Sequence, residues 1–149
     1  MDKDFKGLVV WRASRELAGM VYRVTLSFPP QERYGLVDQM RRSSVSVASN
    51  IAEGHGRGTR RDFAHFLTYS SGSLSELETQ ALIASDIGYL PTENLQELTI
   101  KIQAIRNMIR NLRSHLLSNP SDGFEIREDT PPPYGDNLDS LPNDFFDLS

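Results

Sequence analysis

Apolar residues recur at spacings of three and four along most of the chain, and this pattern predicts a protein built from α-helices. We expect helices over roughly residues 5–28, 33–52, 59–88 and 92–117. Proline or glycine separates them at residues 29–30, 54–58 and 88–91. No segment alternates with the period of two that marks a strand. Four long helices with short connections predict an all-α fold, an up-down antiparallel four-helix bundle over residues 1–117.

The third and fourth helices have the clearest pattern. Thr59-Arg-Arg-Asp62 matches the capping motif that starts a helix. Two buried seams are expected, one at Phe63, Leu67, Ser70, Leu74, Leu77, Ala81, Ala84 and Gly88, the other at Leu95, Leu98, Ile102, Ile105, Ile109, Leu112 and Leu116. Gly72 falls inside the third helix, where glycine costs about 1 kcal/mol relative to alanine. We therefore expect another helix to cross closely at Gly72.

The first two helices carry more apolar and small residues than one bundle requires. One face of the first helix is predicted to hold Leu8, Trp11, Ala18, Val21 and Thr25, with Leu17, Met20, Val24 and Leu26 beside or outside it. The second helix places Leu36, Met40, Val47 and Ile51 on one side and small residues over much of the rest. This surplus predicts self-association.

Residues 118–149 have a different composition from the rest. They carry one arginine against eight acidic residues, whereas residues 1–117 carry 15 Lys+Arg against 12 Asp+Glu. Prolines at 120, 131–133 and 142 oppose helix formation, so we expect a disordered acidic tail. Three roles remain open for it: a solvated tail, a tethered competitor for the basic surface of residues 1–117, or a segment whose two phenylalanines dock into a partner.

Length and composition set further bounds. A chain of 149 residues without cysteine predicts one domain with no disulfide or thiolate metal site, which fits the reducing cytoplasm. No apolar run has the length of a membrane span, and the charged N-terminus does not resemble a signal peptide.

Catalytic patterns are absent from the sequence. The three histidines lack metal-binding spacing, and there is no G-x-S-x-G nucleophile motif. The glycine-rich residues 54–58 lack the G-K-[ST] ending of a phosphate-binding loop and indicate a turn between helices. Glu76 and Glu78 point in different directions on a helix and make a poor acid/base pair. We therefore expect no enzyme, no metal and no cofactor.

Five arginines within residues 39–61 form the candidate nucleic-acid site, and they are Arg41, Arg42, Arg57, Arg60 and Arg61. The last three cluster where the third helix begins, and helix N-termini favour anions. Arginine matches phosphate with a planar fork of donors. The alternative is that these arginines form salt bridges with Glu53, Asp62, Glu76 or Glu78. Arg41 and Arg42 should differ in environment, because adjacent helical residues point about 100° apart.

Asn50 and Gly54 lie where the second helix is expected to end. Asparagine is a weak helix former, and its amide can bond backbone groups that a glycine turn leaves open. We therefore expect a structural role for Asn50, as a cap of this helix end.

A set of motifs in one order resembles the four-helix-bundle proteins encoded in 23S ribosomal RNA intervening sequences. The motifs are Leu8-x-x-Trp11, Phe28-Pro29, Glu32-x-Tyr34-Gly35-Leu36, Gln39-x-Arg41-Arg42, Ser49-Asn50-Ile51-Ala52-Glu53-Gly54, Gly56-Arg57, Phe63-x-x-Phe66-Leu67, Gly72-Ser73-Leu74-x-Glu76-Leu77-Glu78 and Gly88-Tyr89-Leu90. They cover residues 5–117. Val47-Ala48 departs from the isoleucine and proline common in the family, which suggests a straighter helix here.

The resemblance implies a cytoplasmic bundle that assembles as a ring-like homopentamer. It also implies similarity to the accessory proteins of diversity-generating retroelements, which bind a reverse transcriptase and its RNA through a basic surface. Two functions follow as expectations: an oligomeric RNA-binding or reverse-transcriptase accessory protein, or a protein–protein interaction scaffold with no nucleic-acid role. The net charge of +3 on residues 1–117 is small for an RNA-binding domain, which keeps the second open.

Overall fold

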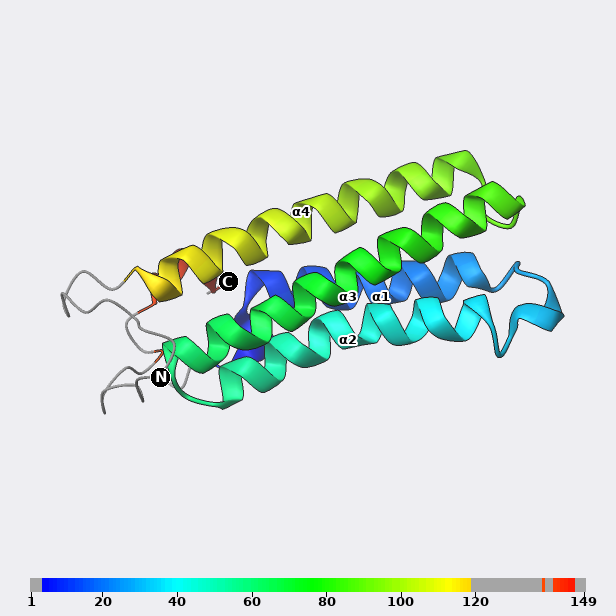
Figure 1. Ribbon diagram of the computed structural model, residues 1–149. Helices are drawn as coiled ribbons and strands as arrows, with labels where there is room; N and C mark the ends of the chain where they lie inside the picture. The colour runs from blue at the N-terminus through cyan, green and yellow to red at the C-terminus, as the bar shows by residue number, and fades with distance from the viewer. Residues whose placement is uncertain (1–3, 119–137, 139–140, 147–149) are drawn as a thin grey trace.

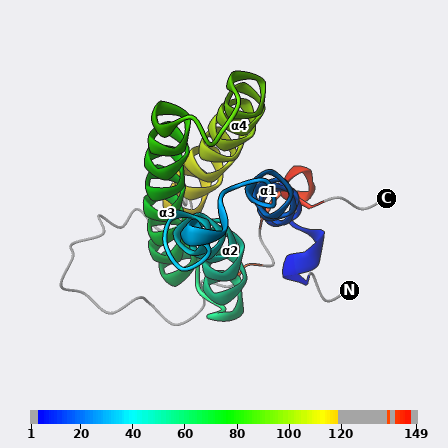
Figure 2. The same ribbon diagram turned by 90° about the vertical axis from the view of Figure 1, so that its right-hand side faces the viewer.

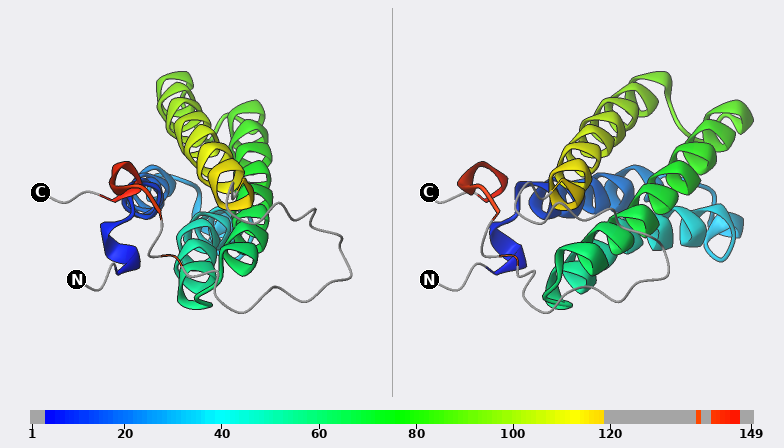
Figure 3. Two further views of the ribbon diagram at one scale, coloured as in Figure 1. Left: turned by 90° about the vertical axis from the view of Figure 1, so that its left-hand side faces the viewer. Right: turned by 60° about the vertical axis from the view of Figure 1, so that its left-hand side comes forward.

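The computed structural model describes residues 4–118, 138 and 141–146, and four long helices make up most of them. These are α1 (Val9–Thr25), α2 (Leu36–Gly56), α3 (Arg60–Ile87) and α4 (Thr92–Leu117). They run up and down in turn (Figure 1), and seen end-on they follow one another around a common core (Figure 2). The predicted four-helix bundle is confirmed. Its two hairpins, α1–α2 and α3–α4, are inclined to each other (Figure 3).

Helices α3 and α4 agree closely with the prediction. The Thr59 hydroxyl accepts a hydrogen bond from the Asp62 amide at 3.2 Å, as the capping motif requires. Gly88 ends α3 in the left-handed conformation, with φ of 93°. The predicted seam residues are buried, apart from Gly88 at this cap and Leu95, which is half-buried.

The predicted bounds of α1 and α2 are wrong by several residues. Residues 5–7 form a short 3-10 helix, η1 (Phe5–Gly7), because the Asp4 carboxylate accepts from the Lys6 amide and caps a separate turn. A second one, η2 (Pro30–Glu32), precedes α2. Helix α2 then continues through Gly54 and Gly56, so the turn to α3 is shorter than expected and uses Gly58, with φ of 83°.

The register predicted for α1 also needs correction. Leu17, expected beside or outside the apolar face, is fully buried, whereas Trp11, expected on that face, is half-buried beside Phe5. Met20 and Val24 pack against the core, so the wide stripe of α1 is largely covered within one chain. Only part of the apolar surplus on α1 therefore remains to support self-association, with Leu26 as its most exposed member.

Small residues join α2 to α3. The Ser70 hydroxyl donates to the Val47 carbonyl at 2.9 Å, and the hydroxyls of Ser46 and Ser73 lie 2.8 Å apart. The expectation of a close crossing at Gly72 is wrong, since a Cβ there would meet no atom within 4 Å. The serines on either side of Gly72 make the contact instead.

Helices α2 and α3 approach each other very closely at Gly54. A Cβ at this position would lie 2.5 Å from the Phe66 Cβ and 3.1 Å from the Phe63 ring. Only glycine lets the phenylalanine side of α3 pack this tightly. This packing explains why α2 passes through Gly54 as a helix, because tertiary contact outweighs a weak local propensity.

The described end of the acidic tail differs from the predicted disorder. Leu138, Leu141 and Phe146 are buried, and Phe146 forms an isolated antiparallel bridge with Leu8. A third short helix, η4 (Asn143–Phe145), carries Phe145 next to the His115 ring, with ring centroids 5.3 Å apart. This segment lies beside the start of α1 (Figure 2). The rest of the predicted tail, residues 119–137, 139–140 and 147–149, lies outside the described part of the chain.

Candidate nucleic-acid interface

The five arginines predicted as one site lie in three different environments. Arg60 is buried, Arg57 and Arg61 lie at the α2–α3 turn, and Arg41 and Arg42 lie near the start of α2. The sequence window of residues 39–61 spans the length of α2, so closeness in sequence does not bring these side chains together.

Arg60 closes the C-terminal end of α4. Its side chain is 4% exposed, and its guanidinium donates to the carbonyls of Leu116 at 3.2 Å and His115 at 3.0 Å. The last carbonyls of a helix have no partner within the helix. A cation at this end also interacts favourably with the negative end of the helix dipole. Arg60 is therefore a structural cap, and it is unsuited to the predicted contact with phosphate.

Arg57 stands at the end of α2 on the surface. Its guanidinium pairs with Glu53 at 2.9 Å and lies over the Phe66 ring, 5.0 Å from the centroid. The predicted alternative of a salt bridge to Glu53 is thus realised here. Both partners are more than half exposed, so the pair is weak and leaves Arg57 accessible. Arg61 is half-buried on the neighbouring turn.

Arg41 and Arg42 point in different directions, as predicted. The Arg41 Nε donates to the Thr25 hydroxyl at 3.0 Å, and its guanidinium stacks on the Tyr22 ring at 4.5 Å. Arg42 extends into solvent, with a side chain 81% exposed, and pairs with Asp38 at 3.4 Å.

These two arginines line a surface hollow of about 700 Å³ between α1 and the start of α2. We call it the arginine–tyrosine hollow, and its lining residues are Tyr22, Arg33, Tyr34, Val37, Asp38, Arg41, Arg42, Val45, Ser46 and Ser49. It contains three arginines and one acid. Its two tyrosines are exposed, Tyr34 by 85% and Tyr22 by 45%.

Glu32 holds the loop that carries Arg33 and Tyr34. One carboxylate oxygen accepts from the Leu36 amide at 3.1 Å and so caps α2, and the other accepts from the Tyr89 hydroxyl at 3.4 Å. This gives the motif Glu32-x-Tyr34-Gly35-Leu36 a physical purpose. It ties the rim of the hollow to the α3–α4 turn at the same end of the bundle.

The chemistry of the hollow suits an unpaired nucleotide strand. Arg33 lies 5.6 Å from the Tyr34 ring centroid, so each tyrosine has an arginine on its face. Aromatic rings and guanidinium planes stack on bases that have left a helix, and arginines bind phosphates. Asp38 reduces the charge but is itself engaged by Arg42.

The motif residues predicted as structural have separate roles. Asn50 does not cap the end of α2: its amide donates to the Ser46 carbonyl at 2.9 Å and to the Ser46 hydroxyl at 3.0 Å, which extends the serine contact with α3. Glu78 pairs with Arg106 of α4 at 2.6 Å, whereas Glu76 is exposed. Gly54 sets the α2–α3 distance, and Gly72 is exposed.

Sequence reasoning missed Tyr22, Arg33 and Tyr34. A signal was present, because Arg33-Tyr34 sits just before α2, and Tyr22 lies on the outer side of α1. These three residues could have been grouped with Arg41 and Arg42 from the sequence. Whether they lie close together, however, depends on how α1 packs against α2.

The part of the chain that the structure describes holds neither a metal site nor a membrane span. No group of three or more His, Asp or Glu side chains within residues 4–118, 138 and 141–146 is arranged to hold a metal ion. Among the helices of this same part of the chain, none combines the length and the apolar character needed to cross a bilayer.

Comparison with known proteins places the sequence and the fold. A family model described as 23S rRNA-intervening sequence protein matches residues 6–111. A solved structure from Bacteroides thetaiotaomicron, described as a protein with unknown function from the S23 ribosomal protein family, superposes with a TM-score of 0.62. It has 22% identity and covers 74% of this chain and all of its own, and at that identity it supports the fold alone. No curated protein matches the chain.

Proposed function

The chain belongs to the 23S rRNA-intervening sequence protein family, and from this premise we propose that it is a non-enzymatic protein that binds single-stranded RNA through the arginine–tyrosine hollow. The observation that carries the proposal is the pairing of Arg33 with Tyr34 and of Arg41 with Tyr22 around one open depression.

The exposed tyrosines favour a single strand over a duplex. Bases within a duplex are stacked on one another, and a duplex offers a protein mainly phosphates and 2′-hydroxyls. An exposed ring such as Tyr34 has no internal packing role to explain its position. Stacking of one base on an aromatic ring contributes roughly 1–3 kcal/mol, which is enough to matter at a small site.

Replacement of the Tyr34 ring is the direct test. In Tyr34→Ala we expect the affinity for a single-stranded RNA oligonucleotide to fall at least five-fold, measured by fluorescence anisotropy. Tyr34→Phe should bind as the wild type does, because the ring is kept. Tyr69→Ala removes another exposed tyrosine, 50% accessible and outside the hollow, and serves as the control. Equal affinity of Tyr34→Ala and wild type would contradict the proposal.

The second candidate is an interaction scaffold, and exposed aliphatic residues favour it. Four aliphatic side chains near the turn that joins α3 and α4 are between 44% and 71% exposed. They are Leu82, Ile83 and Ile87 of α3 and Ile100 of α4. Such residues fit an interface between copies of the chain. We propose that the protein is a homo-oligomer, a pentamer in keeping with the family resemblance; in the scaffold alternative this face carries the function and RNA has no role.

A further inference from the structure

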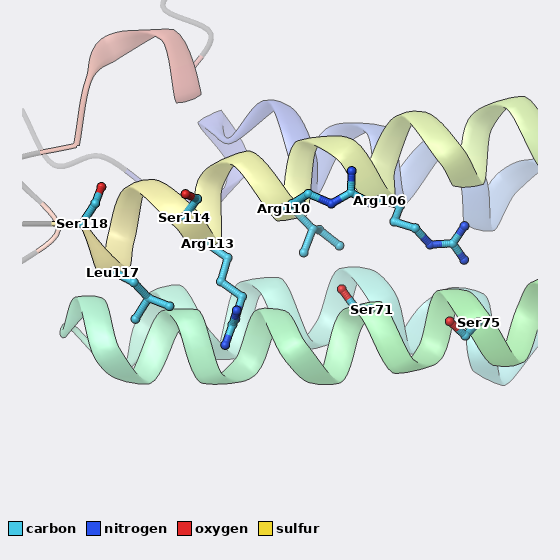
Figure 4. Close-up of a pocket in the computed structure, with 9 residues that line it drawn as sticks. Ser71, Ser75, Arg106, Arg110, Arg113, Ser114, Leu117 and Ser118 are labelled. Atoms are coloured by element: carbon cyan, nitrogen blue, oxygen red, sulfur yellow. The ribbon is translucent and has the colours of Figure 1, made fainter. Parts of the chain in front are cut away.

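A second arginine-lined surface lies on the other hairpin, between α3 and α4. It is a groove of about 600 Å³, and we call it the α3–α4 groove (Figure 4). Its lining residues are Ser71 and Ser75 of α3, Arg106, Ile109, Arg110, Arg113, Ser114 and Leu117 of α4, and Ser118. Arg113 extends from α4 toward α3 in Figure 4. None of the five arginines predicted from the sequence belongs to this groove.

The arginines of the groove form a row. Arg106, Arg110 and Arg113 follow one another at helical spacings of four and three, which places them on one face over about 10 Å. No acidic residue occurs in α4 after Glu97. Ser71 and Ser75 of α3 line the opposite wall. Glu78 of the same helix forms an ion pair with Arg106. The part of the groove around Arg110 and Arg113 is therefore positively charged, and no acidic residue among the lining residues neutralises it.

Two of the three guanidiniums are available to a ligand. Arg106 is held by Glu78 at 2.6 Å, with a side chain 23% exposed. Arg110 makes only a long contact of 3.4 Å with the Asn107 side chain, and Arg113 has no hydrogen bond or ion pair within the residues that the structure describes. Ion pairing by Arg106 also fixes one end of the row, so the groove is partly organised before a ligand arrives.

The composition of the walls indicates which ligand fits. Guanidiniums and hydroxyls are both donors to phosphate oxygens. No aromatic side chain lines the groove, so it lacks a ring on which a base could stack. Contacts of this kind hold a nucleic-acid strand in position without reading its bases.

We propose that the α3–α4 groove binds the sugar–phosphate backbone of RNA, with Arg110 and Arg113 each contacting a phosphate and the serine hydroxyls donating to neighbouring oxygens. The inference rests on the proposed RNA-binding function and adds a second contact surface to it. The hollow on α1–α2 stacks on bases, and the groove on α3–α4 holds the backbone.

The salt dependence of binding tests this division. Each phosphate contact in a single strand adds about 0.7 to the slope of log K against log salt concentration. Arg110→Gln/Arg113→Gln in the full chain should therefore lower the slope by about 1.4, so that the loss of affinity between 50 and 200 mM salt shrinks roughly seven-fold. Arg12→Gln/Arg15→Gln removes the same charge at the same spacing from α1 and should leave the slope near that of the wild type.

The outcomes separate the two proposals. If the wild type binds no RNA, the proposed function fails and the groove assignment fails with it. If the wild type binds but the groove variant keeps the same slope, or both double variants lower it equally, only the groove assignment is overturned. Competition adds a chemical distinction: inorganic polyphosphate should displace RNA from the wild type more effectively than poly-glutamate of equal charge. Equal displacement would show that charge alone, and not phosphate geometry, governs binding, and would overturn the assignment.

Discussion

Leu8 and Phe146, from opposite ends of the chain, form an antiparallel backbone bridge, and both are buried. The Phe146 ring lies 6.3 Å from the ring of His55 near the end of α2. Gly7 also lies next to the Phe146 ring, since a Cβ on Gly7 would be 3.6 Å from that ring. The C-terminal segment thus closes one end of the bundle with an apolar residue.

Phe146→Ala should release this segment. Full burial of a phenylalanine contributes about 1.5–3 kcal/mol, and we expect the loss to appear as local opening while the four helices stay folded. Hydrogen exchange should rise at residues 5–8 and 141–146 with little change in α3. The exposed Asp144→Asn serves as the control, and cooperative loss of the whole fold in Phe146→Ala would contradict this view.

Gly54→Ala should destabilise the fold by about 1–3 kcal/mol, because its methyl group would overlap the Phe66 side chain. Gly72→Ala offers a matched control in an open helical position, where alanine should stabilise by up to about 1 kcal/mol. Urea denaturation of both variants gives the comparison. Similar effects of the same sign would show that close packing at Gly54 is not needed.

Arg60→Met should cost about 2–3 kcal/mol, since it leaves carbonyls at the end of α4 without their charged donor. Its affinity for RNA should equal that of the wild type when both are folded. Arg57→Gln/Arg61→Gln tests whether the other two arginines predicted at the α2–α3 turn contribute to RNA binding. A selective loss of RNA binding in Arg60→Met would restore the original prediction for this residue.

The ion pair between Glu16 of α1 and Lys101 of α4 should give a small pH dependence. The hydrogen bond and charge of Lys101 lower the pKa of Glu16 below its ordinary value of 4.5. The stabilisation is therefore present above that ordinary value and is lost as the pH falls through the lowered pKa. Because Glu16 is largely exposed, we expect less than about 1 kcal/mol.

Lys101→Met provides the measurement. At pH 7 it should be slightly less stable than the wild type, and the difference should shrink as the pH falls below 4.5, the ordinary pKa of Glu16. The pKa of Glu16, followed by NMR, should return toward its ordinary value in this variant. An unchanged pKa would mean that the pair does not persist in solution.

The homo-oligomer is tested by light scattering of the full chain at micromolar concentration. We expect a mass several times 16.8 kDa, five-fold for a pentamer. Ile83→Glu/Ile87→Glu should reduce that mass, because both residues are exposed on α3 and charge would oppose their burial. A monomeric mass for the wild type would refute the proposal.

The periodic seams of α3 and α4 made those helices predictable to within about one residue, because the heptad pattern and the caps at Thr59 and Gly88 agree. The ends of α2 were less predictable, since the packing of Phe66 on Gly54 outweighs the local preference of glycine for a turn. Leu17 was misplaced because α1 contacts both α2 and α4, so its apolar stripe does not identify a single face. Arg60 could be recognised as a cap only after α4 was placed beside the start of α3.

The candidate site shows the same limit. Arginine content in a sequence window identified Arg41 and Arg42, yet Tyr22, the ring that stacks with Arg41, comes from α1, and the Arg33–Tyr34 pair precedes α2. The row on α4 is visible in the sequence as Arg106, Arg110 and Arg113, but its significance depends on the serine wall supplied by α3. Sites formed between two helices need the packing of those helices to be known.

The contact of Arg60 with the last carbonyls of α4 has a mechanical consequence. It joins the first turn of α3 to the last turn of α4. The last turn of α4 therefore cannot unwind without breaking the contact with the Arg60 guanidinium. The point where the C-terminal region leaves the bundle is thereby anchored. Ser118, the final lining residue of the α3–α4 groove, directly follows this capped turn, so the same contact stabilises that end of the groove.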